Sequence, residues 1–566
     1  MKRSSVAGSE VSGLQADKNF DPAVLRSTEW TFADVWETIA CAVPDRVALV
    51  HGDQRVTWRE FNRRADGIAA ALLDSGLKPQ DKVALYLHNA PAYLESVFAA
   101  LKARLVPVNT NYRYTGDELV QLWTDADAAA VVFHGAFAAQ AEAVRARCPA
   151  VRVWLFVDDG ETSCPGWAVR YETAAQASAQ RTVAAPGRSG DDQIIIYTGG
   201  TTGLPRGVMW RQHDLFLASN TTNDPEIADL DHVCRRLGGT TPPVGLPAAP
   251  LMHGTGFVFA ATILNRGGTV VTLPGMSFDV TQLLDTMTRE GVTDLCIVGD
   301  AFCRPIVDAL DLEPERWNLS RLRVVSSSGM AWSASIKERL LVHAPEALLI
   351  DFLNSSEASG MGRALTSAKK AASGARFQLG KNACVIDDAG RPIAKGSGQA
   401  GRVAVRGHLP LGYYKDPEKT AATFPVIDGV RYSIPGDLAT VDDDGAITLL
   451  GRGSTCINTG GEKVFPEEVE DAIKSHAGVA DALVIGVPHV RFGQMVVAAV
   501  EWADGTASDE NALLDHLRGR LAGHKIPRAV MPMDSLGRGP NGKADRPGVT
   551  ARIIAWLEKR ETEKTV

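Results

Sequence analysis

Closely paired cysteines are absent from this sequence. Its 566 residues include eight cysteines, none in a CxxC spacing, and histidines do not cluster near them. Disulfide frameworks belong to small secreted domains, and structural zinc sites need closely spaced thiolates and imidazoles. The cysteines are therefore interpreted as small apolar core residues of a protein in a reducing compartment, and the cytoplasm is the expected location.

An excess of basic residues and a long apolar run are also missing. Lys and Arg total 59 against 67 Asp and Glu, which gives a net charge of -8. Nucleic-acid-binding proteins usually carry a basic balance or stripe, so nucleic acid is not an expected partner. No apolar run reaches the roughly 18–20 residues that cross a bilayer, and the basic N-terminal start lacks the apolar core of a secretory signal. Neither a transmembrane segment nor a signal peptide is predicted.

From about Trp30 the sequence alternates between short apolar runs and amphipathic stretches. The apolar runs include "DKVALYL", "AAAVVFHG", "DLCIVGD", "LRVVSSSG" and "ALLIDFLNSSE". This pattern predicts an α/β fold whose mostly parallel sheets are covered by helices. Ligands of such sheets bind outside the carboxyl ends of the strands. The clusters Ser326–Gly329 and Asn354–Glu357 are therefore expected to line one crevice.

Local signals place several elements in the first part of the chain. Gly52-Asp53 predicts a hairpin turn between two strands. Thr57 followed by Glu60 predicts a capping box at the start of a helix that ends before Gly76.

Near residue 400 the pattern changes to strands and tight turns, with Asp444-Gly445 as a predicted hairpin turn. A compact α+β unit of roughly a hundred residues follows Arg452. One of its helices is expected to begin at Pro466 and to end at Gly478, and another to be capped by Ser508.

The stretch "YTGGTTGLPRGVM", Tyr197–Met209, follows an apolar run and is rich in glycine and threonine. It does not match a Walker A sequence. Its glycines let backbone N–H groups approach an anion, Thr198, Thr201 and Thr202 add hydroxyls, and Arg206 adds positive charge. A Gly-rich turn between a strand and a helix is the alternative. The combination favours a phosphate-binding loop.

This loop resembles the phosphate-binding signature Y-T-S-G-T-T-G-x-P-K-G-V of the adenylate-forming superfamily, which includes acyl-CoA synthetases, nonribosomal adenylation domains and beetle luciferases. Gly199 replaces the serine of that signature and Arg206 its lysine. Further segments resemble the family's signatures in the family's order, over all but the first thirty or so residues. They are "ALKARLVPVNTNYRYTGDEL", "PAAPLMHGTGF", "SSSGMAWS", "LNSSEAS", "IPGDLATVDDDGAITLLGR", "INTGGEKVFPEEVE", "HKIPR" and "GPNGKADR".

The resemblance implies a site for ATP and Mg²⁺. Lys543 takes the place of the family's catalytic lysine, with Glu357 and Thr201 as the magnesium ligands. A carboxylate and a hydroxyl suit magnesium, which keeps waters and binds substrate phosphates. The implied nucleotide-binding residues are Thr198, Gly199, Gly200, Thr201, Thr202, Gly203, Arg206, Ser328, Gly329, Asn354, Ser355, Ser356, Asp437, Arg452 and Lys543.

The resemblance also implies sites for the acid and for coenzyme A. Gly460 and Gly461 would face the pantetheine arm, and Lys525 and Arg528 are candidates for the 3′-phosphate of CoA. The predicted acyl pocket is small or apolar and lacks a charge for an amino acid's ammonium group. We therefore expect a hydrophobic acid, with fatty, steroid side-chain and aryl acids as the possibilities. The predicted acyl-binding residues are His253, Phe257, Gly299 and Met330, beside Ser355.

The family's reaction has two halves. A carboxylate attacks the α-phosphate of ATP to give an acyl-adenylate and pyrophosphate, and the thiol of CoA then displaces AMP. Members rotate a small C-terminal domain between these halves, and Ser454 stands near the family's hinge position. We accordingly predict a flexible tail over 1–28, a large ATP- and acyl-binding domain over 29–452, and a small mobile domain over 453–566 that carries Lys543.

Other interpretations stay open at this point. The chain could load a carrier protein instead of CoA, catalyse a luciferase-like oxidation, or bind a nucleotide without turnover. Taken alone, His253 could be an ordinary core histidine, and Asp442–Asp444 reads as a solvated turn because the EF-hand calcium spacing is missing. The oligomeric state does not follow from the sequence.

Overall fold

The computed structural model of the protein describes residues 29–114, 116–177, 187–198, 205–220, 229–239, 241–369, 376–452, 457–459, 462–489, 493–503, 505–506, 508–521, 523–539 and 542–564. The predicted tail, 1–28, lies outside the described residues. Within the described ranges, no helix combines the length and the apolar character needed to span a membrane.

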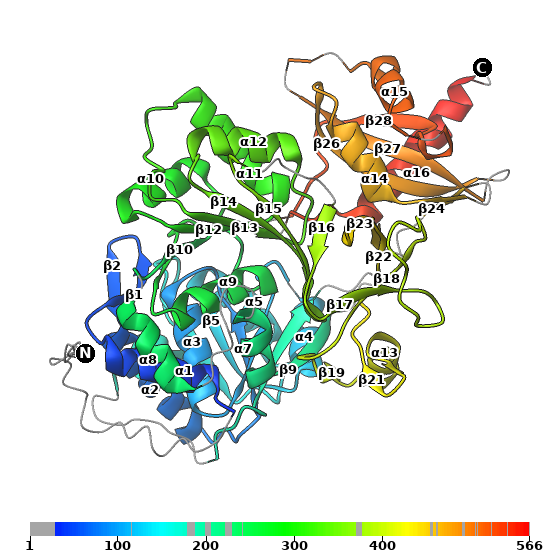
Figure 1. The fold of residues 1–566 in the computed structure, drawn as a ribbon. Coiled ribbons are helices and arrows are strands. Elements are labelled where there is room, and N and C mark those ends of the chain that lie inside the picture. Colours follow the sequence, from blue (N-terminus) through cyan, green and yellow to red (C-terminus); the bar gives the residue numbers. More distant parts are fainter. Residues whose placement is uncertain are drawn as a thin grey trace, which may run out of the picture.

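The larger sheet of the N-terminal part runs in the order β17-β18-β22-β23-β16-β15-β14-β13-β12-β10-β11-β1-β2 (Figure 1). Neighbours from β14 to β1 are parallel, and the strands beyond β14 pair antiparallel. This antiparallel extension is the strand-rich region that the sequence predicts near residue 400. The strands are β1 (Val47–His51), β2 (Gln54–Thr57), β10 (Val244–Pro247), β11 (Thr269–Thr272), β12 (Asp294–Ile297), β13 (Val324–Ser328), β14 (Leu348–Ser355), β15 (Ala358–Thr366), β16 (Arg376–Leu379), β17 (Ala383–Ile386), β18 (Gly401–Val405), β22 (Asp437–Val441) and β23 (Ala446–Arg452).

A second sheet runs in the order β19-β9-β8-β4-β3-β5-β6-β7 and is parallel from β8 to β7. The fold is therefore α/β with mostly parallel sheets, as predicted. Its strands are β3 (Lys82–Tyr86), β4 (Val106–Asn109), β5 (Ala128–His134), β6 (Val153–Val157), β7 (Val169–Arg170), β8 (Gln193–Thr198), β9 (Arg206–Arg211) and β19 (Gly412–Tyr413). A separate two-stranded ribbon joins β20 (Val426–Ile427) and β21 (Val430–Arg431).

Helices fill the space between the two sheets and cover their outer faces. The largest apolar core joins α1, α2, α3 and α9 to strands of both sheets, and a second core packs α10, α11 and α12 on the larger sheet (Figure 1). Because α9 lies in the first core, its N-terminus is held between the sheets. The helices are α1 (Phe32–Ala42), α2 (Trp58–Asp74), α3 (Pro91–Lys102), α4 (Asp117–Asp125), α5 (Ala138–Arg145), α6 (Tyr171–Gln176), α7 (Gln212–Asn220), α8 (Leu230–Gly239), α9 (Gly254–Asn265), α10 (Val280–Glu290), α11 (Gly299–Leu312), α12 (Ala334–His343) and α13 (Pro417–Thr423).

The C-terminal elements, coloured orange to red in Figure 1, form a smaller α+β domain with apolar cores of its own. Strand β27 pairs antiparallel with β26 along one edge, and it also pairs with β24 at Gly493 and in parallel with β28 along Val497–Glu501. The elements are β24 (Ile457–Thr459), β25 (Glu462–Val464), α14 (Pro466–Lys474), β26 (Val479–His489), β27 (Gly493–Trp502), α15 (Glu510–Arg518), β28 (Ala529–Met533) and α16 (Arg546–Lys564).

The predicted hairpins are confirmed, since β1 pairs with β2 and β22 with β23, both antiparallel. The capping box of α2 is only half present. Thr57 accepts the N–H of Glu60 at 3.2 Å, but the Glu60 carboxylate pairs with Arg63 at 2.6 Å. Because Arg63 binds the Glu60 carboxylate, that carboxylate does not complete the capping box at Thr57.

Two predicted helix boundaries in the small domain are wrong. The cap of α15 is Asp509, whose carboxylate accepts the N–H of Ala512 at 2.9 Å, and not Ser508. A charged acceptor complements the positive end of the helix dipole better than a hydroxyl does. Helix α14 ends at Lys474, so Gly478 belongs to the turn before β26.

Candidate active site

The phosphate-binding loop predicted at 197–209 joins two antiparallel strands. Thr198, the last residue of β8, stands opposite Arg206, the first of β9. The alternative of a turn from a strand into a helix is therefore wrong. Gly199, Gly200, Thr201, Thr202 and Gly203 lie outside the described residues, so the structure gives the two anchors of this loop.

Arg206 is fixed by an ion pair at the base of the loop. Its Nε donates to Oδ2 of Asp416 at 3.2 Å, and both side chains are about one-third exposed. Asp416 also caps α13 by accepting the N–H of Lys419. The ion pair thus holds the guanidinium at the base of the loop, and among the described residues its hydrogen bond is made by Nε alone.

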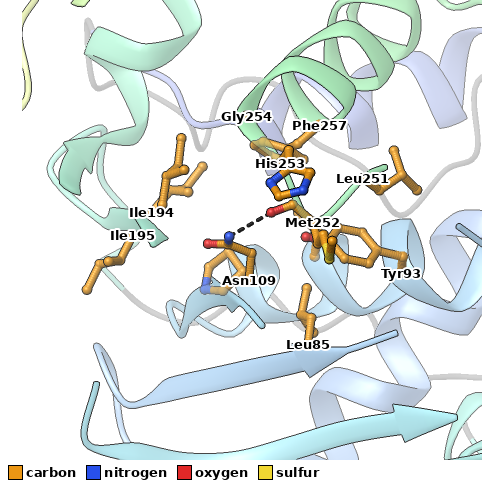
Figure 2. Close-up of a pocket in the computed structure, with 13 residues that line it drawn as sticks. Leu85, Tyr93, Asn109, Ile194, Ile195, Leu251, Met252, His253, Gly254 and Phe257 are labelled. Atoms are coloured by element: carbon orange, nitrogen blue, oxygen red, sulfur yellow. Dashed lines mark hydrogen bonds between the residues drawn. The ribbon is translucent and has the colours of Figure 1, made fainter. Parts of the chain in front are cut away.

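A cavity with about 310 Å³ of empty space lies beside His253, between β3, β4, β8 and α9 (Figure 2). Most of its lining is apolar, as the sequence predicts for an acyl pocket. His253 and Phe257 contribute to it. The lining residues are Leu85, Tyr93, Val97, Pro107, Asn109, Ile194, Ile195, Ile196, Leu251, Met252, His253, Gly254 and Phe257.

His253 is half-buried at the N-terminus of α9. Burial lowers the pKa of its imidazole to about 4, and the positive charges of Lys543 and Arg113 lower the pKa further in the same direction. The imidazole is therefore neutral near pH 7. The charge of Lys543 in the small domain therefore acts on this imidazole in the large domain.

The turn before Lys543 packs against the large domain. The N–H of Gly542 donates to the Gly539 carbonyl at 2.8 Å, and Gly539 donates to the Lys543 carbonyl at 2.7 Å. A Cβ atom at Gly542 would stand 3.1 Å from Cγ of Met330 and 3.4 Å from Cγ1 of Val298. Met330 therefore lies under the lysine-bearing turn.

Gly299 and Met330 are not among the residues that line the cavity, although the sequence places them in the acyl pocket. Gly299 has φ +56, and a Cβ atom there would collide with the Ala331 carbonyl, so this bend requires glycine. The two residues lie together at the side of the site that faces Gly542.

The clusters that end β13 and β14 share one edge of the larger sheet. These strands are parallel neighbours, with Ser328 opposite Phe352. Ser328 is half-buried, and a Cβ atom at Gly329 would stand 3.9 Å from Oγ1 of Thr255 in the first turn of α9. The end of β13 thus faces the helix that begins after His253.

The segment after β14 is fixed by hydrogen bonds to backbone groups. Asn354 accepts the N–H of Gly360 at 2.7 Å, and Ser355 accepts the N–H of Ala358 at 3.1 Å. The carbonyl of Ser356 accepts the indole N–H of Trp210 on β9 at 3.0 Å. The segment therefore joins the strand that follows the phosphate-binding loop to the larger sheet.

Glu357 is oriented from two sides. The hydroxyl of Tyr413 on β19 donates to its Oε1 at 2.8 Å, and Ser433 donates to its carbonyl at 2.7 Å. Burial and the Glu357 charge raise the pKa of Tyr413, so the phenol keeps its proton. One fixed carboxylate suits Mg²⁺, whose other ligands are commonly water and substrate phosphates.

Asp437 begins β22 and is 7% exposed. It stands opposite Arg452 on β23 in the strand register. The two residues predicted to contact the ribose thus belong to one antiparallel pair. Gly460, Gly461 and the predicted hinge residue Ser454 lie outside the described residues.

The candidate CoA contacts lie in the small domain. Lys525 forms an ion pair with Glu468 at 2.6 Å, and the backbone of Arg528 leads into β28 by donating to the Val496 carbonyl. The aspartates at 442–444 form a turn, as predicted. Arg376 pairs with Asp442 at 2.8 Å and with Asp444 at 2.5 Å.

Asn109, at the end of β4, is a site residue that sequence reasoning did not single out. Its amide N–H₂ donates to the Met252 carbonyl at 2.6 Å and to the Tyr197 carbonyl at 2.9 Å, and its Oδ1 accepts the Tyr197 N–H at 2.7 Å. Figure 2 shows the bond to Met252 beside His253. Asn109 therefore ties the strand that enters the phosphate-binding loop to the residue before His253. Its position in the "PVN" segment was the available signal.

Asn89 fixes an earlier part of the segment that leads to His253. It donates to the carbonyls of Pro247 at 3.3 Å and Ala249 at 3.1 Å and accepts the N–H of Leu251 at 2.7 Å. Two asparagines thus replace the sheet hydrogen bonds that the loop at 247–252 cannot make.

The sequence matches two family models. The AMP-binding enzyme model matches residues 36–414, and the AMP-binding enzyme C-terminal domain model matches residues 468–543. A medium/long-chain-fatty-acid–CoA/3-oxocholest-4-en-26-oate–CoA ligase from Mycolicibacterium smegmatis is 38% identical over 91% of this chain and 94% of its own. A 3-oxocholest-4-en-26-oate–CoA ligase from Rhodococcus rhodochrous is 39% identical over 91% of this chain and 94% of its own.

Solved structures agree in fold. ATP-bound MatB from Rhodopseudomonas palustris is 27% identical, with a TM-score of 0.75 over 91% of this chain and 98% of its own. The anthranilate CoA ligase AuaEII, in complex with anthranoyl-AMP, has a TM-score of 0.80 at 21% identity, over 94% of this chain and 99% of its own. With both family models matched in order along the chain, this protein belongs to the AMP-binding enzyme family.

Proposed function

We propose that the protein is an acid–thiol ligase. It would convert a hydrophobic carboxylic acid to its CoA thioester through an acyl-adenylate, consume ATP, and release AMP and pyrophosphate. The observation that carries the proposal is the apolar cavity beside His253, together with the packing of the turn before Lys543 against Met330 and Val298 of the large domain. The similarity to CoA ligases over 91% of the chain supports the same reaction.

The first half-reaction brings two anions together. A carboxylate oxygen of the acid attacks the α-phosphorus of ATP, and the bond to the bridging oxygen breaks as pyrophosphate leaves. Phosphoryl-centre chemistry of this kind depends on positioning and charge neutralisation. The ammonium of Lys543 would offset the charge of the carboxylate and the α-phosphate, and Arg206 that of the leaving pyrophosphate. The neutral His253 contributes an N–H without adding charge.

Glu357, held by Tyr413, and Thr201 are the proposed holders of Mg²⁺. The ion would supply further neutralisation of the triphosphate. Asp437 and Arg452 are proposed to bind the ribose. Thr198, Gly199, Gly200, Thr202 and Gly203 would cradle the phosphates, and Ser328, Gly329, Asn354, Ser355 and Ser356 would surround the adenine.

In the second half-reaction the thiol of CoA attacks the acyl carbonyl, a C–S bond forms, and AMP leaves. Lys543 would occupy the approach to the carbonyl during adenylation, so the small domain would move away before the thiol attacks. We propose that this motion separates domains at 29–452 and 453–566 about the segment that contains Ser454. Gly460 and Gly461 would then line the pantetheine path.

The acid is proposed to be a long-chain fatty acid or a steroid side-chain acid. The residues that line the cavity include no Asp or Glu, so an α-ammonium group would be buried there without a counter-charge. The one side-chain amide in the lining, that of Asn109, is engaged by backbone groups. Two relatives at 38–39% identity are named for fatty and steroid acids, which agrees with this choice.

Pyrophosphate release tests the proposal. Purified protein with ATP and Mg²⁺ should release pyrophosphate with fatty or steroid acids and form thioester only when CoA is added. If thioester forms with a holo-carrier protein but not with CoA, the acyl acceptor is the carrier protein and not CoA. If no fatty, steroid or aryl acid of a test panel causes pyrophosphate release, the proposed ligase activity is wrong.

A further inference from the structure

One polar side chain in the lining of the cavity beside His253 is not used by the proposed chemistry. Tyr93 lies on α3, lines the cavity and is only 2% exposed. In the part of the chain that the structure describes, no hydrogen bond joins its hydroxyl to another residue. A hydroxyl withdrawn from water without a partner costs free energy. The cavity therefore holds one buried hydroxyl that a ligand in the cavity could pair.

Helix α3 gives this hydroxyl a fixed position. Tyr93 and Val97 lie one turn apart on the helix, and both line the cavity, so the helix presents one face to it. Every residue of α3 is buried. Figure 2 shows the ring of Tyr93 extending from α3 toward the space below His253 and Met252. A side chain on a buried helix is well suited to recognise one position of a ligand.

The other polar side chains of the described lining already have a role. The amide of Asn109 is bonded to backbone groups of Tyr197 and Met252. His253 belongs to the reacting end of the site, where the charge of Lys543 acts on it. Apart from these residues and Tyr93, the lining consists of aliphatic side chains, Met252, Phe257, a proline and a glycine. Tyr93 is thus the lining side chain suited to bind a polar group on the hydrocarbon body of the acid.

The chemistry of the phenol limits what that group is. Burial raises the pKa of Tyr93, so the hydroxyl keeps its proton and acts as a donor near pH 7. The described lining contains no Lys or Arg, so a second carboxylate would lose its hydration there without a counter-charge. A neutral oxygen, as in a ketone or an alcohol, accepts the hydrogen bond and brings no charge into the cavity.

We propose that Tyr93 is a specificity-determining residue: its hydroxyl donates a hydrogen bond to a neutral keto or hydroxyl oxygen on the hydrocarbon body of the acid. The inference rests on the proposed function and narrows its substrate class to hydrophobic acids that carry such an oxygen. An acid without the oxygen leaves the buried hydroxyl unpaired, and sites built around a buried polar group discriminate against ligands that lack its partner.

Pairs of acids that differ only in this oxygen test the inference. One set consists of hexadecanoic acids with a single keto or hydroxyl group at different chain positions, each compared with unsubstituted hexadecanoic acid. The other pair is a steroid side-chain acid with and without a ring ketone. The measurement is kcat/KM for acid-dependent pyrophosphate release. Wild-type protein should prefer at least one oxygen-substituted acid over its parent by roughly tenfold, as one hydrogen bond to a buried group predicts. The keto and hydroxy members show which oxygen is preferred.

Tyr93→Phe removes the hydroxyl and keeps the ring. We expect kcat/KM for the preferred acid to fall roughly tenfold, so that the preference disappears. For the unsubstituted parent, kcat/KM should equal or exceed the wild-type value. A role of Tyr93 in packing alone would change both acids equally, so the ratio between them is the informative quantity.

Tyr171→Phe is the matched control, since Tyr171 is also buried but its hydroxyl has partners. It donates to Oε2 of Glu95 at 3.0 Å and lies 3.2 Å from the Ala92 carbonyl on α3. This variant should keep the wild-type preference between the acids and lower the free energy of unfolding. Tyr93→Phe, which loses no hydrogen bond to the described residues, should not lower it. Urea denaturation without any acid compares the two variants.

Three results would overturn the inference. They are a wild-type protein that prefers none of the oxygen-substituted acids, a Tyr93→Phe variant that keeps the preference, and a stability loss in Tyr93→Phe as large as that in Tyr171→Phe. Failure of the proposed function looks different, because the wild-type protein would then release no pyrophosphate with any acid.

Discussion

At the scale of single residues, the neutral state of His253 follows from where the fold puts it. The side chain is largely withdrawn from solvent beside apolar strands and lies within reach of two positive charges, and each of these disfavours a second proton on the ring. A sequence can place a histidine in a signature, but it cannot supply the burial that keeps the ring neutral.

Stability should depend on pH through this residue. The pKa of His253 is about 4 in the folded protein, against about 6.5 for an unperturbed histidine. Between these values the unfolded chain binds more protons, so the free energy of unfolding should fall as pH decreases from about 6.5 to 4. Urea denaturation across this range would measure the slope.

His253→Asn should reduce that slope without removing it, because burial also lowers the pKa of His134 to about 4. If the slope of the unfolding free energy against pH is unchanged in the variant, the folded protein does not lower the pKa of His253.

Lys543→Ala should separate the two half-reactions. Loss of the ammonium that joins the carboxylate to the α-phosphate should slow adenylation roughly 10²- to 10³-fold, as loss of a preorganised charge typically does. Thioester formation from preformed acyl-adenylate should be nearly unaffected. Single-turnover assays of each step are the measurement, with the exposed Lys78→Ala as the control. Equal loss in both steps would contradict the assignment.

At the scale of elements, the loop before His253 is held by side chains and not by strand pairing. Asn109→Ala removes three hydrogen bonds, two of them to Tyr197 at the entry to the phosphate-binding loop. We expect a raised KM for the acid, slower adenylation, and a stability loss of about 1–3 kcal/mol. Steady-state kinetics and urea denaturation would report these effects.

Asn89→Ala is the comparison. It removes three bonds to the same loop but none to Tyr197, so it should reduce stability with a smaller effect on adenylation. If the two variants lose activity equally, the link from Asn109 to Tyr197 has no special role.

Tyr413→Phe should weaken the proposed magnesium site. Without the hydroxyl bond at 2.8 Å, Glu357 loses its orientation, and loss of such a partner commonly costs 10- to 100-fold in metal affinity. A titration of adenylation against Mg²⁺ should show a higher half-saturating concentration. The adjacent Tyr414→Phe loses a bond to Asp127 at 2.7 Å instead and should behave as wild type. A shared shift in both variants would speak against the role of Tyr413.

Sequence patterns predicted the elements better than their ends. Buried parallel strands such as β12 and β13 are short apolar runs with no competing period, so they are recognisable. Ser508 and Asp509 are adjacent acceptors, and the sequence does not show that Asp509 is the one that reaches the helix N–H groups. The bond of Glu60 to Arg63 likewise depended on side-chain geometry that spacing alone does not give.

At the scale of the whole molecule, the family signatures predicted two domains and the reaction class, but not how the domains touch. The contacts of Gly542 with Met330 and of Asn109 with Met252 join segments far apart in the chain. Periodicity and motif spacing are local, so they carry no information on such pairs. The apolar wall from β3, β4 and α3 was missed for the same reason.

The interface between the domains should be sensitive at Gly542. This residue has φ +72, and a Cβ atom there would press on Met330 at 3.1 Å. Gly542→Ala should therefore slow adenylation several-fold while thioester formation changes less, because the added methyl group opposes the arrangement in which Lys543 faces His253. Single-turnover rates for each step would show this.

Gly537→Ala separates contact from backbone strain. Gly537 has φ +60 in the same segment, but no atom lies within 4 Å of its Cβ position. An equal loss of adenylation in Gly537→Ala would mean that strain in the segment, and not contact with the large domain, explains the result.

The cavity's described lining lies entirely between Leu85 and Phe257, whereas the proposed catalytic lysine is residue 543. A gene encoding this architecture can accumulate changes in the first stretch without altering the second. Over evolutionary time, the preferred acid can drift while the chemistry is inherited intact. The relatives named for fatty acids and for steroid acids agree with such independent inheritance.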